Sequence, residues 1–457
     1  MSTGTSARTR IREGAASLIG AANSLQVRKL VGGAALSGGL KLIGMGLGFL
    51  FYLAVAAVTG PEAYGVFAAG FSLATIAGFA ATLGQHTAVL RFWPAIDQIH
   101  GPGVASHAIV RSFRLTLAGS IAVAVALFIV GIVQRRVAGG GPAEEFYLVV
   151  GVLGAAFALS EFAVAAARAR GALWWALAPR DIGWRVLVIA VCGGVALLPA
   201  TADRHVAISG PVALLIAAVT LLLVTAPQLA IVLKGAAADV RQHFLPLEEK
   251  RAMIRATPGL WGGAIAEPIG NQAATLIVGL ALGPVAAGAF FAASRLSQLL
   301  AIPLVGITMV SAPMMARAWR GNAVNELRGI FWGTAAAATL GTAVGVIGMA
   351  FVGRTALAMF DPHYASAFLV LLILSASQLV NAAAGSVKTL YQMTGHDRRF
   401  LAIETLWALA GIGMVWWGGV NHGLVGAALG FLAQRFARNL HALLGLPTLL
   451  RYGRAES

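Results

Sequence analysis

About twelve long apolar runs constrain the fold of this chain more than any other feature. Each run is long enough to cross a bilayer, which takes about 20 residues of helix. The runs are continuous, whereas the strands of a membrane β-barrel alternate in polarity over about ten residues. They therefore predict about twelve transmembrane helices, at roughly 30–59, 63–88, 108–133, 145–169, 180–200, 208–233, 257–282, 285–315, 327–352, 363–391, 399–419 and 422–447.

Composition supports a location in the membrane. Of the 457 residues, 58% are hydrophobic and only 11% are charged, whereas about a quarter of the residues of a soluble protein are charged. The net charge of +16 does not indicate nucleic-acid binding, because the basic residues lie in short gaps between apolar runs. A nucleic-acid interface would need a soluble basic face with interleaved aromatic residues.

A turn motif repeats at half the length of the chain. One copy begins at Gly60-Pro61 and the other at Gly283-Pro284, and each continues with three residues, a glycine, one residue and a phenylalanine. The fixed φ of proline suits the first turn of the helix that follows. An interval of about 223 residues predicts two similar halves.

Six helices in each half would make the halves parallel repeats, because an even number of crossings returns the chain to its starting side. Such repeats are related by an axis along the membrane normal. The predicted division is a basic segment at 1–29, a six-helix bundle at 30–233, a linker at 234–256, a second six-helix bundle at 257–447 and a tail at 448–457.

The distribution of Lys and Arg predicts the orientation. With the N-terminus inside, the inner segments hold about 27 of the 33 basic residues, in agreement with the positive-inside rule. This count places Arg91, Arg180 and Arg435 at the inner side. Both termini are therefore expected to be cytoplasmic. The outer loops hold only Arg135, Arg136, Arg204 and Arg354.

The sequence contains no recognisable enzyme or cofactor motif. It has no Walker-type phosphate loop, no His-Glu-x-x-His metal motif and no cytosolic domain large enough for a nucleotide site. The single cysteine, Cys192, excludes a thiolate metal cluster. We expect a protein that is not an enzyme and holds no cofactor or metal.

Ionisable residues inside the runs are candidate functional residues, because charge is costly in lipid. Arg295 lies eleven residues after Pro284, hence roughly 16 Å from the outer surface at a helical rise of about 1.5 Å per residue. Glu267 lies at a similar depth. Either these two pair in one conformation and separate in another, or they form a static buried pair. Lys41 is close enough to the inner boundary either to snorkel or to line a cavity.

Other polar residues extend the candidate site. Pro268 and Gly270 directly follow Glu267 and are candidate hinge or gate residues, because a proline frees a backbone carbonyl and bends the helix. Interhelical hydrogen bonding is the alternative role for the remaining polar residues. These further candidates for substrate binding are Asn271, Gln272, Gln378, Asn381 and Lys388.

Three motifs resemble a known family. They are Gly-Pro-Glu-Ala-Tyr-Gly at 60–65, Ala-Gly-Phe-Ala-Ala-Thr-Leu-Gly at 77–84 and Ala-Val-Leu-Arg-Phe-Trp at 88–93. The pattern resembles the polysaccharide-biosynthesis flippases of the multidrug/oligosaccharidyl-lipid/polysaccharide flippase superfamily. The resemblance implies two six-helix bundles arranged as a V around a central cavity. Many relatives carry a basic residue just before the first Gly-Pro, and this chain has none there.

The resemblance also implies a function. Such flippases move undecaprenyl-diphosphate-linked oligosaccharides across the bacterial inner membrane by alternating access, for the assembly of O-antigen, capsule or exopolysaccharide. Cationic residues of the cavity receive the diphosphate, a role that Arg295 fits and Lys41 fits less securely. The implied partners are the lipid-linked oligosaccharide, the bilayer, and the polysaccharide polymerase and chain-length machinery, with no nucleic acid.

Three alternatives remain open. A cation-coupled multidrug antiporter of the same fold would need acidic and aromatic residues in the cavity, and the sequence offers few carboxylates at mid-membrane depth. A flippase for the peptidoglycan precursor is a close neighbour that the sequence does not exclude. A membrane-bound glycosyltransferase or polymerase would need a sizeable loop with catalytic groups, and the loops here are short.

Overall fold

The chain is helical throughout the part that the structure describes, which confirms the predicted all-α class. The computed structural model describes residues 25–138, 143–197, 208–240 and 243–446. The predicted segments 1–29 and 448–457 fall largely or wholly outside these ranges. The side chain of Lys41, a candidate binding residue on the first helix, is also not described.

Two groups of helices follow one another along the chain, and we call them the first half and the second half. The first half consists of α2 (Leu25–Thr59), α3 (Pro61–Ala81), α4 (Gln85–His100), α5 (Pro102–Ala138), α6 (Ala143–Ala169), α7 (Leu173–Ala178), the π-helical η1 (Pro179–Gly183), α8 (Trp184–Ala196) and α9 (Gly210–Val240).

The second half begins inside the predicted linker, because α9 and α10 both extend into residues 234–256. It consists of α10 (Leu247–Leu282), α11 (Pro284–Leu299), α12 (Ile302–Arg320), α13 (Val324–Ala358), the 3-10 helix η2 (Pro362–Ala367), α14 (Phe368–Ala383), α15 (Val387–Met393) and α16 (Asp397–Leu444).

Three runs that the sequence predicts as single helices are broken in the structure. The run at 63–88 divides into α3 and α4, since Leu83 and Gly84 adopt left-handed backbone angles with φ of 49° and 71°. Gly84 is required there, because the backbone of Leu260 on α10 lies where a Cβ would be placed. The run at 363–391 divides into α14 and α15 at Gly385, whose φ is 63°. The run at 285–315 divides between α11 and α12.

The longest helix, α16, is a hairpin of two antiparallel arms. Non-helical backbone angles at His422 and Gly423 mark the turn. The arms then pack backbone against backbone, because an added Cβ at Gly418 would meet the carbonyl of Gly426. The predicted runs 399–419 and 422–447 correspond to these two arms.

The structure agrees with twelve crossings. Within the described residues, ten segments are long and apolar enough to cross a membrane. One of the ten is the whole of α16, so its second arm adds a crossing. The segment from α7 through η1 to α8 (Leu173–Ala196) adds another.

The two copies of the repeated turn motif lie against each other. An added Cβ at Gly65 on α3 would collide with the carbonyl of Pro284 on α11, and one at Gly288 would lie 3.2 Å from the Cα of Gly65. Gly65 and Gly288 hold equivalent places in the two copies. A contact between equivalent residues indicates a local two-fold axis between α3 and α11.

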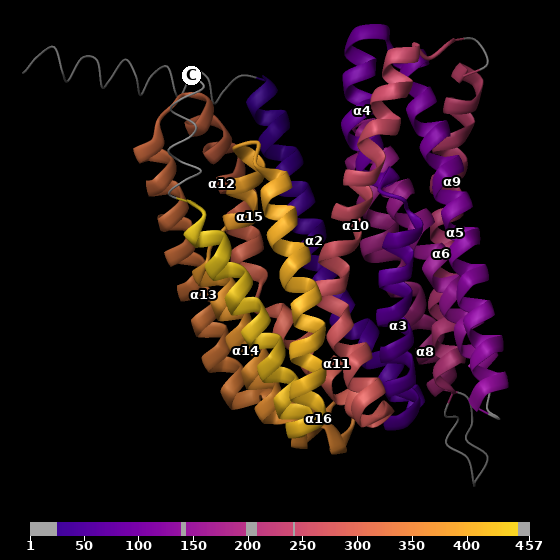
Figure 1. Ribbon diagram of the computed structural model, residues 1–457, viewed down its shortest axis with the longest axis vertical. Coiled ribbons are helices and arrows are strands. Elements are labelled where there is room, and N and C mark those ends of the chain that lie inside the picture. Colours follow the sequence, from indigo (N-terminus) through magenta and orange to yellow (C-terminus); the bar gives the residue numbers. More distant parts are fainter. Residues whose placement is uncertain (1–24, 139–142, 198–207, 241–242, 447–457) are drawn as a thin grey trace, which may run out of the picture.

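The halves form a V. We name its two ends: the turn end carries the two Gly-Pro motifs, and the linker end carries the end of α9 and the start of α10. Figure 1 shows the bundles joined at the turn end, at the bottom of the view, and diverging toward the linker end, where α4, α12 and α15 lie. The V-shaped pair of parallel six-helix repeats predicted from the sequence is confirmed.

A substitution at the α3–α11 crossing tests this packing. We expect Gly65→Ala to lower the free energy of unfolding by about 1–3 kcal/mol, because the added methyl group overpacks a backbone contact. The matched control is Gly46→Ala on α2, where no atom lies within 4 Å of an added Cβ. This control should be neutral or stabilising by up to about 1 kcal/mol. Thermal unfolding in detergent measures both, and equal behaviour would contradict the crossing.

Candidate functional site

A polar cavity lies between the halves, away from the crossing of α3 and α11. It consists of two adjoining pockets of about 520 Å³ and 550 Å³. The larger pocket belongs almost wholly to the second half. The smaller one also has walls from α3 and α4, including Phe79 and His86, and extends to Asp397 at the linker end. The residues that line both pockets are Glu267, Asn271, Gln272, Lys388, Phe400 and Glu404.

The structure thus brings together most of the residues that the sequence singled out. Glu267, Asn271 and Gln272 come from α10, Gln378 and Asn381 from α14, and Lys388 from α15, and all six line the larger pocket. They converge because α16 packs against α10, α14 and α15. Their role in binding a substrate stays a prediction.

Arg295 lies on α11 between the halves, over rings of α2 and α3, and is not among the described residues that line either pocket. Its guanidinium group donates hydrogen bonds to Gln272 at 2.9 Å and to Gln298 at 3.0 Å. It also lies over the rings of Tyr52 and Phe291, at 4.9 Å and 4.2 Å from their centroids. Neutral amides and aromatic faces therefore hold this cation, and no carboxylate of the described residues forms a salt bridge with it.

The predicted contact between Glu267 and Arg295 is not formed in this conformation. Glu267 instead pairs with Lys388, with 2.6 Å between Oε2 and Nζ. Both side chains face the cavity, with 56% and 44% of their surface exposed. An ion pair this exposed to solvent contributes little to stability, because water screens the attraction between the two charges.

A second ion pair is buried where α14 and α16 meet. Arg438 donates to Glu404 at 3.0 Å and to Asn381 at 3.0 Å, and only 13% and 8% of the Arg438 and Glu404 side chains are exposed. Asn439 lies beside them and approaches the same Asn381 oxygen at 3.5 Å. Two charges taken out of water are costly unless they are paired and hydrogen-bonded; here both terminal nitrogens of Arg438 have partners, whereas its buried Nε has none among the described residues.

Arg435 was missed as a site residue. The charge count assigns it to the inner side, but the structure places it inside the second half, with 8% of its surface exposed. It donates to Asn271 at 2.9 Å and lies 5.0 Å from the ring centroid of Phe431. A signal was available: Arg435 and Arg438 interrupt an apolar run at a spacing of one helical turn, so both lie on one face.

The first half has its own charged cluster. Arg180, in the π-helical segment η1, forms a 2.5 Å ion pair with Glu161 on α6. Arg185, one turn further, donates to the backbone carbonyl of Gly44 on α2 at 2.6 Å. Gly44 is needed for this approach, since an added Cβ would lie 2.6 Å from the guanidinium group. The Arg185 hydrogen bond fastens α2 to α8, and the Arg180 pair fastens η1 to α6.

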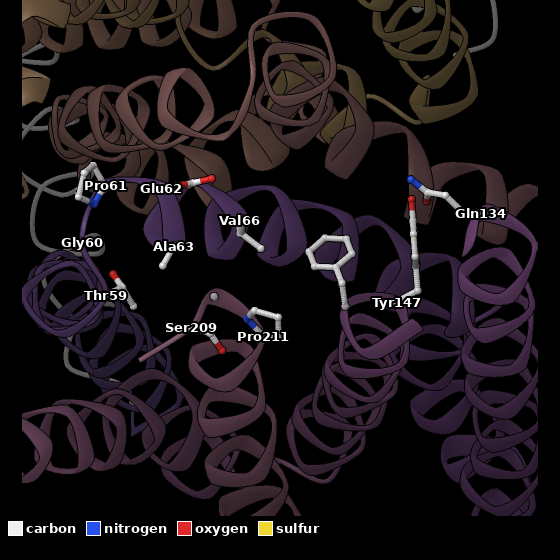
Figure 2. A pocket seen from close by; sticks show the side chains of 12 residues that line it. Thr59, Gly60, Pro61, Glu62, Ala63, Val66, Gln134, Tyr147, Ser209 and Pro211 are labelled. Atoms are coloured by element: carbon white, nitrogen blue, oxygen red, sulfur yellow. The ribbon is translucent and has the colours of Figure 1, made fainter. Parts of the chain in front are cut away.

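Another cavity, of about 770 Å³, lies at the turn end of the first half. Figure 2 shows its lining, in which Glu62 is the only charged side chain among the described residues, with Thr59, Tyr147, Ser209 and Pro211 nearby. Tyr147 and Ser209 lie close in the sequence to 139–142 and 198–207, which are outside the described ranges. The candidate site is therefore the cavity between the halves.

The comparisons identify the fold. No family model matches the sequence, and no curated protein sequence matches it. Solved structures do match. One is an inward-facing multidrug resistance MATE family transporter of the MOP superfamily, with TM-score 0.67 and 14% identity over 89% of this chain and 96% of that one. The chain has the MOP-superfamily transporter fold.

Two further neighbours of this fold have similar scores. A MATE structure in complex with MaL6 matches with TM-score 0.66 and 16% identity, over 93% of this chain and 97% of that one. A MOP-superfamily transporter from Pyrococcus furiosus matches with TM-score 0.64 and 16% identity, over 93% and 95%. That transporter is described as having a binding pocket of reversed polarity, which suggests a different function for it. The neighbours are transporters, and this chain is a multi-pass membrane protein.

The two ion pairs of the cavity should differ in their contribution to stability. We expect Arg438→Met to lower the free energy of unfolding by about 3–5 kcal/mol, because it leaves the buried Glu404 carboxylate unpaired. Lys388→Met, the same replacement at the exposed pair, should change it by less than about 1 kcal/mol. Adding Glu404→Gln to Arg438→Met should recover part of the loss. Chemical unfolding followed by tryptophan fluorescence measures these changes, and equal losses for both single variants would contradict the assignment.

Proposed function

We propose that this protein exports amphiphilic organic molecules by alternating access, with the cavity between the halves as the binding site. The observation that carries the proposal is a polar cavity between two pseudo-symmetric halves that meet at the turn end. The excess of Lys and Arg toward the linker end supports a cytoplasmic position for that end. In this interpretation the structure is inward-facing.

The comparisons favour a multidrug antiporter over the lipid-linked oligosaccharide flippase that the sequence resemblance implied. Two of the neighbours described above are MATE structures, and one of these is a multidrug resistance transporter. The smaller pocket supports this choice, because Arg438 neutralises its Glu404 and the remaining carboxylates, those of Glu267 and Asp397, stand against the single amine of Lys388. Phe79 and Phe400 supply aromatic faces. Carboxylates beside aromatic rings suit a lipophilic cation.

Transport by purified protein tests this function. Vesicles containing the protein should move a fluorescent lipophilic cation across the bilayer, and Glu267→Gln should reduce that rate about tenfold by removing a charge that attracts the cation. The control Glu62→Gln makes the same change in the turn-end pocket and should leave the rate unchanged. If none of a panel of such cations is transported faster than in protein-free vesicles, the antiporter function is ruled out.

The second candidate, the flippase, is favoured by a different observation. Among the described residues, neither Arg295 nor Arg435 forms a salt bridge, so both retain the capacity to bind an anion. A peptidoglycan precursor carries the same diphosphate and is covered by the same test.

The leaflet in which the lipid-linked oligosaccharide is found separates this candidate from the antiporter. Vesicles with undecaprenyl-diphosphate-linked oligosaccharide in one leaflet should show its transfer only if the flippase is correct, and Arg295→Ala should then abolish transfer. Transfer of the lipophilic cation without transfer of the oligosaccharide would select the antiporter.

Helix α10 is the element that relative motion of the halves must bend. Its beginning packs on the first half: Met253 is buried among α4 and α5, and Trp261 donates to the carbonyl of Ala80 at 2.9 Å. Its later residues pack on the second half, where Asn271 accepts from Arg435, and also contact α3 of the first half, where Gln272 accepts from Ser72 at 3.4 Å. Gly262, Gly263 and Pro268 lie between these attachments. The hinge predicted at Pro268 and Gly270 is therefore close to the place where the two attachments meet.

A pair of proline substitutions tests this hinge. We expect Pro268→Ala to slow transport about tenfold, because restoring the missing helical hydrogen bond stiffens α10 where it has to bend. Pro258→Ala changes the same helix within the part attached to the first half and should leave the rate within a factor of about two. Unaltered transport in Pro268→Ala would show that α10 moves as a rigid rod.

A further inference from the structure

Tyr364 connects the two halves at the turn end. It lies on η2 of the second half, and its hydroxyl donates a 2.8 Å hydrogen bond to the carbonyl of Pro61 on the first half. The side chain is almost fully buried, with 1% of its surface exposed. It fits because Gly288 has no side chain, since an added Cβ there would overlap the Tyr364 hydroxyl. The hydrogen bond exists only while the turn end is closed.

Tyr64 lies beside Tyr364, with 6.1 Å between the ring centroids. It is equally buried, but its hydroxyl has no hydrogen-bond partner among the described residues. Aromatic rings enclose it: those of Phe67, Phe291 and Phe360 have their centroids 5.9 Å, 6.2 Å and 6.0 Å away. Burying a hydroxyl without a partner is unfavourable, because the hydrogen bond that it makes with water is lost.

The two tyrosines therefore act in opposite directions on one closed contact. Tyr64 also has no counterpart across the repeat, because Ala287 holds the equivalent place in the second copy. The aromatic cluster at the turn end (Phe49, Tyr64, Phe360 and Tyr364) draws residues from α2 and α3 of one half and from the segment between α13 and α14 of the other. Separation of the halves at this end would expose both hydroxyls to water.

We propose that this aromatic cluster is the turn-end gate of the transporter, in which the Tyr364–Pro61 hydrogen bond stabilises the closed state and the buried Tyr64 hydroxyl destabilises it. The proposal rests on the alternating access proposed above. Because these two contributions oppose each other, the closed state does not become too stable to open. Closure gains one interhalf hydrogen bond and at the same time strips water from a neighbouring hydroxyl.

The test uses two substitutions that each remove a single oxygen atom. Tyr364→Phe should shift the equilibrium toward the open state, and Tyr64→Phe should shift it toward the closed state, each by about fivefold, which is the usual net effect of one hydrogen bond. Spin labels at Val212→Cys on α9 and Phe351→Cys on α13, in a Cys192→Ala background, report the distance between the halves near this end. Both labelled positions are exposed.

Pulsed electron–electron double resonance on the full chain in lipid nanodiscs measures the two distance populations. Opposite shifts, with thermal stability close to that of the wild type, support the gate. Shifts in the same direction for both variants, or no shift in either, overturn it.

The same labels separate failure of the gate from failure of the proposed function. If the wild type and both variants show one unchanging distance, with and without a transported lipophilic cation, alternating access itself is lost. If two distances appear and their populations respond to the cation but not to the two tyrosine substitutions, only the proposed gate is overturned.

Discussion

The contact between Gly65 and Gly288 is the constraint on which the rest of the structure depends. Two helices from equivalent places in the repeat cross where neither has a side chain, so their backbones approach closely. This contact fixes the axis between the halves and joins them at one end. The volume that the diverging helices leave toward the other end becomes the polar cavity. A side chain at either glycine would separate the halves and change the shape of everything between them.

The cavity combines charges that are fixed with charges that are accessible. Arg438 and Glu404 neutralise each other in a buried network and hold α14 and α16 together. Glu267 and Lys388 are exposed to solvent and line both pockets, whereas Arg435 lines the larger pocket but is buried against Asn271 and Phe431. A solute that enters therefore meets groups of both signs within a short distance. This arrangement suits amphiphilic molecules with a charged head, and the fold does not select the sign.

The sequence predicted the architecture well, because the period and length of apolar runs depend on the bilayer rather than on packing details. The repeat of Gly60-Pro61 at Gly283-Pro284 also predicted the parallel halves. The breaks at Gly84 and Gly385 were missed, since a glycine inside an apolar run reads equally well as a packing residue. The pairing of Glu267 with Lys388 was not predicted, because depth in the membrane does not determine which helix faces which. Arg435 was assigned to the inner side, since charge counting does not register the direction of a side chain.

Helix α10 begins the second copy of the repeat, yet Met253 completes the apolar core formed by α4 and α5 of the first. If the two halves arose by duplication of a six-helix unit, the ancestral unit needed a second copy of itself to supply that residue. It also follows that α4 and α5 cannot finish packing until the ribosome has made the start of the second half. The first half therefore completes its folding only together with the start of the second half.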